Sequence, residues 1–247
     1  MLDLAIFLDD GGVMNDNRLR YGEWQRLIGE FFSPRLGGSP ERWAEANRDL
    51  IAGLWDQALM DQARMGLVDA YHEWSHRYQL DWLRTMAGHV GVSTPDDEDE
   101  AFALAAEAAR YVTLRCRAAF PEAPTAIRIH ALSGLTLYTA SGEDSNEIDG
   151  YLRCMGVREH FQHLFGPDLV NAFKAGPVYY ERAFDLAGLD PARCLVIDDS
   201  PEALRWAAEA GARTILMDRD ATKRAGWGGH VVSSLTELLP LLEQMEA

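Results

Sequence analysis

Two kinds of hydrophobic pattern divide the chain. Between residues 17 and 120, apolar residues recur at helical spacing, whereas before and after this stretch short apolar runs alternate with amphipathic segments. Apolar residues three and four positions apart mark one face of a helix, and short continuous apolar runs are typical of buried parallel strands. The middle of the chain is therefore predicted to be a helical block, with helices within residues 21–32, 40–60, 68–90 and 97–120.

The remainder of the chain predicts alternating strands and helices. A first strand is expected at residues 4–8, and further strands at 135–139, 168–173, 193–198 and 212–217, with helices over 143–157, 176–189, 200–211 and 234–245. Strands that alternate with helices form βαβ units and a parallel sheet. We therefore predict an α/β fold: a Rossmann-like parallel-sheet core with helices on both faces, formed by residues 1–16 and 121–247, and an inserted helical cap domain over residues 17–120.

The composition limits which binding partners and which cellular compartment are expected for this chain. The net charge of −16 argues against nucleic acid and against anionic membrane surfaces, because both attract basic patches. It is compatible with a small phosphorylated substrate if a divalent cation supplies local positive charge. An odd number of cysteines without metal-type spacing suggests a reducing compartment. We expect no membrane span and no signal peptide, and hence a cytoplasmic protein, while the oligomeric state stays open.

Chemically capable residues follow four of the predicted strands. Asp9 follows the first strand, Thr139 ends the second, Lys174 follows the third, and the pair Asp198-Asp199 ends the fourth. Active sites of parallel sheets lie at the carboxyl ends of the strands, so these residues are expected to converge. Converging carboxylates repel one another unless a cation joins them, and Mg²⁺ suits hard oxygen ligands. In this arrangement Asp9 could act as a nucleophile, while Lys174, one of only two lysines in the chain, could neutralise it.

These motifs resemble those of the haloacid dehalogenase-like hydrolase superfamily over nearly the whole chain. "FLDDGGVM" resembles the first family motif with Asp9 as the nucleophile, and Lys174 in "KAGP" resembles the third. Thr139 takes the place of the second motif's hydroxyl residue, with Ala140 where Asn is usual. The fourth motif, "VIDDSPEAL", is the most specific match. The helices inserted after the first motif resemble the family's cap.

The resemblance implies a complete set of site residues. Mg²⁺ would be held by Asp9, the Gly11 carbonyl, Asp198 and Asp199, and the phosphate would be bound by Thr139, Ala140 and Lys174. Ser141 is an alternative phosphate ligand to Thr139, which we prefer because it ends the apolar strand.

One family residue is missing. The family's general acid stands two residues after the nucleophile, and Gly11 occupies that position here. We interpret Asp10 as a non-catalytic residue that points away from the nucleophile, because neighbouring residues on an extended chain face opposite ways.

Three functions are compatible with this pattern. The favoured one is a Mg²⁺-dependent phosphatase that acts on a small phosphorylated metabolite through an aspartyl-phosphate at Asp9. A catalytically impaired member that binds a ligand or a protein is the alternative, since a lost general acid typically costs roughly 10²–10⁴-fold in rate. A 2-haloacid dehalogenase would tolerate Gly11, because a halide leaves without a proton, but the pair Asp198-Asp199 counts against it.

Overall fold

The computed structural model describes residues 4–49, 53 and 68–246. The strands are β1 (Ala5–Leu8), β2 (Thr136–Ala140), β3 (Phe161–Phe165), β4 (Cys194–Asp198), β5 (Arg213–Met217) and β6 (His230–Val232). They form one sheet in the order β3-β2-β1-β4-β5-β6, and every neighbouring pair is parallel. The predicted α/β fold with a parallel sheet is confirmed.

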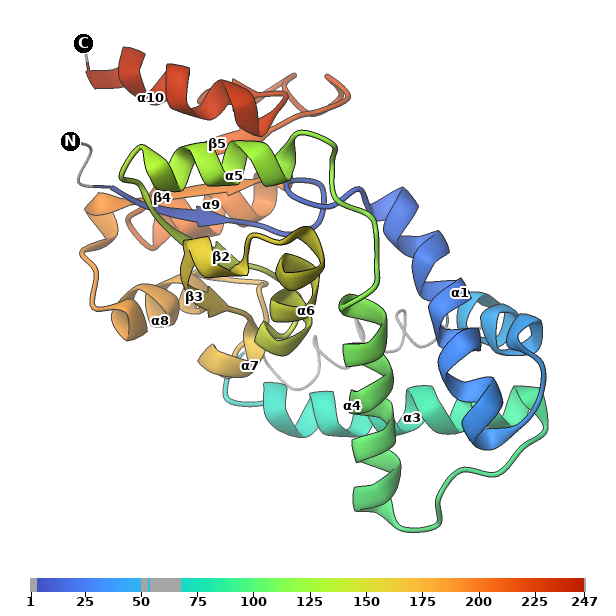
Figure 1. Ribbon diagram of the computed structural model, residues 1–247. Coiled ribbons are helices and arrows are strands. Elements are labelled where there is room, and N and C mark those ends of the chain that lie inside the picture. The colour runs from blue at the N-terminus through green and yellow to red at the C-terminus, as the bar shows by residue number, and fades with distance from the viewer. Residues whose placement is uncertain (1–3, 50–52, 54–67, 247) are drawn as a thin grey trace.

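Helices cover both faces of this sheet (Figure 1). One hydrophobic cluster joins alternate strand residues such as Ile6 and Leu8 to α5 (Ala123–Leu132), α6 (Ser145–Met155) and α10 (Leu238–Glu246). The intervening residues, such as Phe7, pack with α8 (Pro177–Ala187) and α9 (Pro201–Glu209) on the other face. Because β1 is buried on both faces, its sequence is a continuous apolar run. Short helices are α7 (Pro167–Val170), η1 (Arg158–His160), η2 (Pro191–Arg193) and η3 (Leu235–Glu237).

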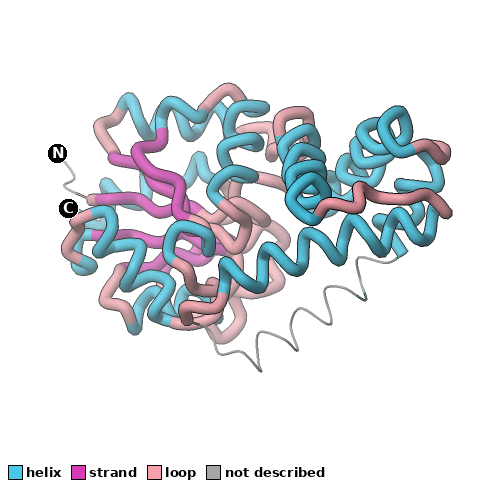
Figure 2. The backbone as a smooth tube through the Cα atoms, turned by 90° about the horizontal axis from the view of Figure 1, so that it is seen from below, coloured by secondary structure: helices cyan, strands magenta, loops and turns pink. Residues whose placement is uncertain are grey.

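A helical block lies beyond the carboxyl end of β1. We use this name for α1 (Asn17–Leu36), the helical residues 40–49, α3 (Tyr71–Val90) and α4 (Glu98–Thr113). It has its own hydrophobic cluster, which includes Phe32 and Trp43. Figure 2 shows the strands gathered at one end of the molecule and this block at the other. The predicted helices are confirmed over these residues; residues 50–52 and 54–60 of the second one lie outside the described part of the chain. The domain boundaries stay a prediction.

Helices α3 and α4 of the helical block both pack against the α/β part. Gly150 of α6 lies so close to α4 that a Cβ built on it would stand 2.0 Å from the hydroxyl oxygen of Thr113. Tyr71 and Trp74 of α3 pack on Phe173, the residue before Lys174. These contacts bring the block to the edge of the sheet where the strands end. Among the described helices, we find none that is both long enough and apolar enough to cross a bilayer.

The strand predicted over residues 168–173 is wrong. The third strand is β3, at residues 161–165, and residues 167–170 form α7. Pro167 occupies the first position of that helix, where its lack of an N–H costs little, and Asn171 ends it with a left-handed φ of 45°. β3 is an edge strand whose Gln162 and His163 are exposed, so its sequence lacks the continuous apolar run of β1 and β4. The edge strand β6 and helix α5 were also not among the predicted elements.

Candidate active site

The register of the sheet brings three strand ends together. Leu8 of β1 pairs with Thr139 of β2 on one side and with Ile197 of β4 on the other. Asp9, the next residue, donates its backbone N–H to the Ile197 carbonyl at 3.0 Å. The nucleophile candidate therefore stands in the middle of the sheet, between the end of β2 and the acidic pair that ends β4.

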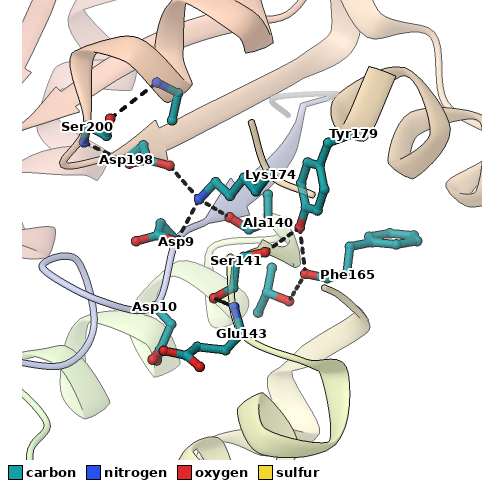
Figure 3. A network of polar contacts seen from close by, with 12 residues as sticks. Asp9, Asp10, Ala140, Ser141, Glu143, Phe165, Lys174, Tyr179, Asp198 and Ser200 are labelled. Atoms are coloured by element: carbon teal, nitrogen blue, oxygen red, sulfur yellow. Dashed lines mark hydrogen bonds and ion pairs between the residues drawn. The ribbon is translucent and has the colours of Figure 1, made fainter. Parts of the chain in front are cut away.

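Lys174 is the centre of the polar network at these strand ends (Figure 3). Its Nζ lies 2.7 Å from Asp9 Oδ1 and 2.6 Å from Asp198 Oδ2, and it donates to the Ala140 carbonyl at 2.6 Å. Of the residues expected to converge, Asp9 and Asp198 are thus both in direct contact with Lys174. Burial alone would lower the pKa of Lys174, but Asp198 and Asp9 raise it well above its ordinary value, so the ammonium stays charged.

The Asp9 carboxyl group is sensitive to charge. Burial, opposed by Lys174 and reinforced by the nearby Asp198, raises its pKa to about 8. A divalent cation at this carboxylate would favour the ionised form that a nucleophile needs.

Three carboxylates are arranged as a possible cation site. Asp9, Asp198 and Asp199 each offer one oxygen, and these oxygens lie within 4.8 Å of one another. Asp198 is oriented by the backbone N–H of Ser200, which donates to its Oδ1 at 2.8 Å. An all-oxygen donor set with carboxylates on a rigid sheet edge fits Mg²⁺. The Gly11 carbonyl as a further ligand stays a prediction.

The loop after β1 has no room for a larger residue at Gly12. Its φ is +79°, and a Cβ built there would lie 2.5 Å from Asp199 Cγ. Glycine adopts this conformation without steric cost. The second glycine of "DDGG" therefore lets Asp199 approach the loop of the nucleophile.

The space beside Gly11 is filled by the start of α1. A Cβ built on Gly11 would lie 2.7 Å from Asn17 Oδ1 and 2.8 Å from Arg20 Nη2. An acid at position 11 would thus meet the ends of two polar side chains of the helical block.

Asp10 belongs to a different set of contacts from Asp9. It is fully buried, and its two carboxylate oxygens accept from Asn15 Nδ2 and Arg20 Nη1, both at 2.6 Å. Burial raises its pKa, and the guanidinium of Arg20 works in the opposite direction. In Figure 3 its carboxylate points away from Lys174, toward Glu143. These contacts agree with the interpretation of Asp10 as a residue outside the reaction.

At the end of β2, a backbone carbonyl contacts Lys174, whereas the hydroxyl groups of the neighbouring residues form hydrogen bonds elsewhere. Thr139 is fully buried, and its hydroxyl donates to the Phe165 carbonyl at 3.3 Å. Ala140 offers its carbonyl to Lys174, and the Ser141 hydroxyl accepts from the Glu143 N–H at 3.1 Å. Phosphate binding by Thr139, Ala140 or Ser141 stays a prediction.

A family model for the haloacid dehalogenase-like hydrolases matches residues 20–211. The chain belongs to this family. The superfamily resemblance drawn from the sequence is therefore confirmed.

One curated protein resembles this chain in sequence, and solved structures resemble it in fold. "Putative phosphatase YhcW" of Bacillus subtilis (strain 168) is 29% identical over 89 residues, which cover 36% of this chain and 40% of that protein. The structure of the "putative HAD-hydrolase YfnB" of Bacillus subtilis, bound to magnesium, has a TM-score of 0.65 at 17% identity, over 97% of this chain and 98% of the other. An L-2-haloacid dehalogenase from Xanthobacter autotrophicus with covalently bound chloropropionic acid has a TM-score of 0.61 at 17% identity, over 99% and 100%. At these identities the two structures show a shared fold.

Two residues that the sequence pattern did not single out also contact the candidate site. Lys223 lies 2.5 Å from Asp199 Oδ2, and Arg219 donates to the backbone carbonyls of Gly12 at 3.1 Å and Val13 at 2.5 Å. Both residues lie in the loop between β5 and β6. The scarcity of lysine was the one signal available in the sequence, because the chain's two lysines, Lys174 and Lys223, both contact acids of the candidate site.

Proposed function

We propose that this haloacid dehalogenase-like hydrolase is a Mg²⁺-dependent phosphatase that acts on a small phosphorylated metabolite. The observation that carries the proposal is the contact set of Lys174 with Asp9 and Asp198, next to the three-carboxylate cluster that Asp199 completes. Two features of named proteins support it. The curated relative carries a phosphatase name, and the solved structure of YfnB holds magnesium.

The chemistry follows from the positions of the side chains. An ionised Asp9 oxygen attacks the phosphorus atom, the bond to the leaving oxygen breaks, and that oxygen keeps the electron pair. Water then attacks the phosphorus of the aspartyl-phosphate, and the P–O bond to Asp9 breaks with its electron pair left on the carboxylate. The proton released by the water passes to the solvent, and inorganic phosphate leaves. Lys174 holds the nucleophile in place by its contacts with Asp198 and Ala140 and places a positive charge beside the transferring group. Bound Mg²⁺, held by Asp9, Asp198 and Asp199, would screen the phosphoryl charge from the carboxylates.

Gly11 shapes the expected substrate preference. Because the leaving oxygen receives no proton from position 11, substrates whose leaving group is stable as an anion should react best. Loss of a positioned acid costs roughly 10²–10⁴-fold, and this cost is greatest for alkyl and sugar phosphates. We therefore expect acyl and aryl phosphates to be hydrolysed faster than alkyl phosphates.

A dehalogenase is the second candidate, and Gly11 is the observation that favours it. A halide leaves as an anion, so displacement of halide by Asp9 needs no acid at position 11. The Xanthobacter autotrophicus dehalogenase shares the fold of this chain.

One experiment separates these functions. Phosphate release from acyl, aryl and sugar phosphates is measured with Mg²⁺ and with EDTA, and chloride release from 2-chloropropionate is measured without metal. Asp9→Asn serves as the control for contaminating activity. Mg²⁺-dependent phosphate release that Asp9→Asn abolishes supports the phosphatase, and metal-free chloride release supports the dehalogenase. Failure to exceed the Asp9→Asn background on every substrate would overturn both and leave a binding role. The cytoplasmic location stays a prediction.

A further inference from the structure

Lys223 occupies a place where a cation would be expected to bind. Its Nζ lies 2.5 Å from Asp199 Oδ2 and 2.8 Å from the Asp199 backbone carbonyl. Asp199 is one of the three carboxylates of the candidate Mg²⁺ site. The ammonium group and a divalent ion would therefore draw on the same carboxylate.

The loop that carries Lys223 is built around Asp218. This residue is buried, and its Oδ1 accepts from the backbone N–H groups of Thr222 and Lys223, while its Oδ2 accepts from the N–H of Arg224. Hydrogen bonds of this kind fix the backbone on which a side chain is mounted. Lys223 thus reaches Asp199 from a fixed backbone position.

Arg219 fastens the same loop to the nucleophile loop. Its guanidinium donates to the Gly12 and Val13 carbonyls and forms an ion pair with Glu122 at 2.7 Å. The contacts of Asp218 within the loop and of Arg219 with the nucleophile loop therefore fix the position of the Lys223 backbone relative to the carboxylates. This anchoring distinguishes Lys223 from a surface lysine that meets an acid by chance.

Charge and burial together indicate which of the two lysines would move away when a metal ion binds. When all three carboxylates are ionised, three negative charges face two ammonium groups, so a divalent cation converts a net negative site into a net positive one. Lys174 has a side chain that is 9% exposed and three polar contacts, whereas the side chain of Lys223 is 39% exposed. Lys223 can return to water at low cost, and Lys174 cannot.

We propose that Lys223 is an internal competitor of Mg²⁺ for Asp199, and that it weakens binding of the free metal ion to this site. The inference rests on the proposed function, because it assumes that the three carboxylates hold Mg²⁺. Lys223 balances the charge of Asp199 while the metal is absent and leaves the carboxylate when the metal binds. Each metal-binding event then includes the cost of breaking the contact between Lys223 and Asp199.

Calorimetric titration of the full-length protein with MgCl₂ alone tests the competition. Lys223→Met removes the charge and keeps most of the side-chain volume, and Lys223→Arg keeps the charge. Arg205→Met is the control for net charge, since Arg205 is an exposed residue of α9. We expect Lys223→Met to bind Mg²⁺ about tenfold more tightly than the wild type, because a full positive charge within a few ångströms of the metal is removed. Lys223→Arg should bind as weakly as the wild type, and Arg205→Met should change the affinity less than about twofold.

The outcomes separate the two proposals. Unchanged or weaker Mg²⁺ binding by Lys223→Met, with clear binding by the wild type, would overturn the competition and leave the phosphatase proposal intact. Tightening by Lys223→Arg as large as that by Lys223→Met would also overturn it, because the charge would then not matter. Absence of Mg²⁺ binding in all four proteins would overturn the metal site itself, and with it both proposals.

Discussion

The buried pair of Asp10 and Arg20 predicts a large and pH-dependent loss of stability when Arg20 is removed. Asp10 is fully buried, and the side chain of Arg20 is 15% exposed, so Arg20→Met would leave a carboxylate with Asn15 as its remaining side-chain partner. Removing one partner of a buried pair typically costs about 3–5 kcal/mol. Because Asn15 still donates to Asp10, we expect about 3 kcal/mol, a large fraction of the roughly 5–15 kcal/mol that stabilises most domains.

The loss of stability in Arg20→Met should increase as the pH rises. The pKa of Asp10 is already raised by burial, and loss of the Arg20 charge raises it further. At pH 4 the unfolded chain is only about half ionised at Asp10, because its unperturbed pKa is about 3.9, so the penalty is small. As the pH rises, the unfolded chain ionises Asp10 while the folded chain resists, and the penalty grows. Arg20→Met should therefore lose more stability at pH 7.5 than at pH 4.

Urea unfolding followed by tryptophan fluorescence at both pH values measures the effect. Arg18→Met is the matched control, because Arg18 lies in the same helix and pairs with Asp16 while its side chain is 77% exposed. Exposed pairs contribute about 0–1 kcal/mol. If Arg20→Met does not fold at pH 7.5, the double variant Asp10→Asn with Arg20→Met should restore folding. A free-energy loss equal to that of Arg18→Met, or a loss that does not change with pH, would refute the reasoning.

Three further predictions concern packing and charge. Gly12→Ala should lower the unfolding free energy by about 2 kcal/mol or more, because alanine is strained at positive φ and its Cβ would strike Asp199. Thermal unfolding measures the loss. Gly142→Ala is the control, since a Cβ at Gly142 would meet nothing within 4 Å. Gly150→Ala should cost about 1–3 kcal/mol in urea unfolding by forcing α6 away from Thr113, whereas Gly22→Ala in α1 should be neutral or stabilising. Asp144→Asn should stabilise the protein at pH 7.5 by up to about 3 kcal/mol and have little effect near pH 4 in urea titrations. The reason is that burial raises the pKa of Asp144 to about 6, so the folded protein loses stability as the pH rises from 4 to 6. Equal effects of Asp144→Asn at the two pH values would contradict this last prediction.

The central part of the sheet could be predicted from the sequence because the relevant signals are local. β1 and β4 are buried on both faces, so each appears as a continuous apolar run followed directly by acids. Parallel strands place such ends at one edge, and Asp9 and Asp198 meet there by that rule. Lys174 contacts both acids from the loop after α7, although the strand predicted before it is wrong. β3 escaped prediction because an edge strand with exposed polar residues lacks this signal.

The contacts around the site could not be predicted because they depend on loop geometry. Lys223 reaches Asp199 through a turn fixed by Asp218, and a turn of this kind has no hydrophobic period. Arg20 lies on α1 like any other basic helix residue, and its partner Asp10 is ten positions away across a glycine turn. The sequence shows which residues are present, but such contacts follow from the path of the backbone between them.

Asp10 and Gly11 are best understood as one adaptation rather than two departures from the family motif. A fully buried carboxylate at position 10 needs a cation, and Arg20 supplies it at 2.6 Å. The guanidinium reaches Asp10 through the volume that a side chain at position 11 would occupy, since a Cβ there would stand 2.8 Å from Arg20 Nη2. A side chain at position 11 and the Arg20 guanidinium that pairs with Asp10 would therefore be close neighbours. Placing the family's acid at position 11 would set a second carboxylate against Arg20, which would hold it ionised and unable to donate a proton to a leaving group. A change at position 11 alone would therefore displace the ends of the Asn17 and Arg20 side chains and set any new carboxylate beside the Arg20 guanidinium.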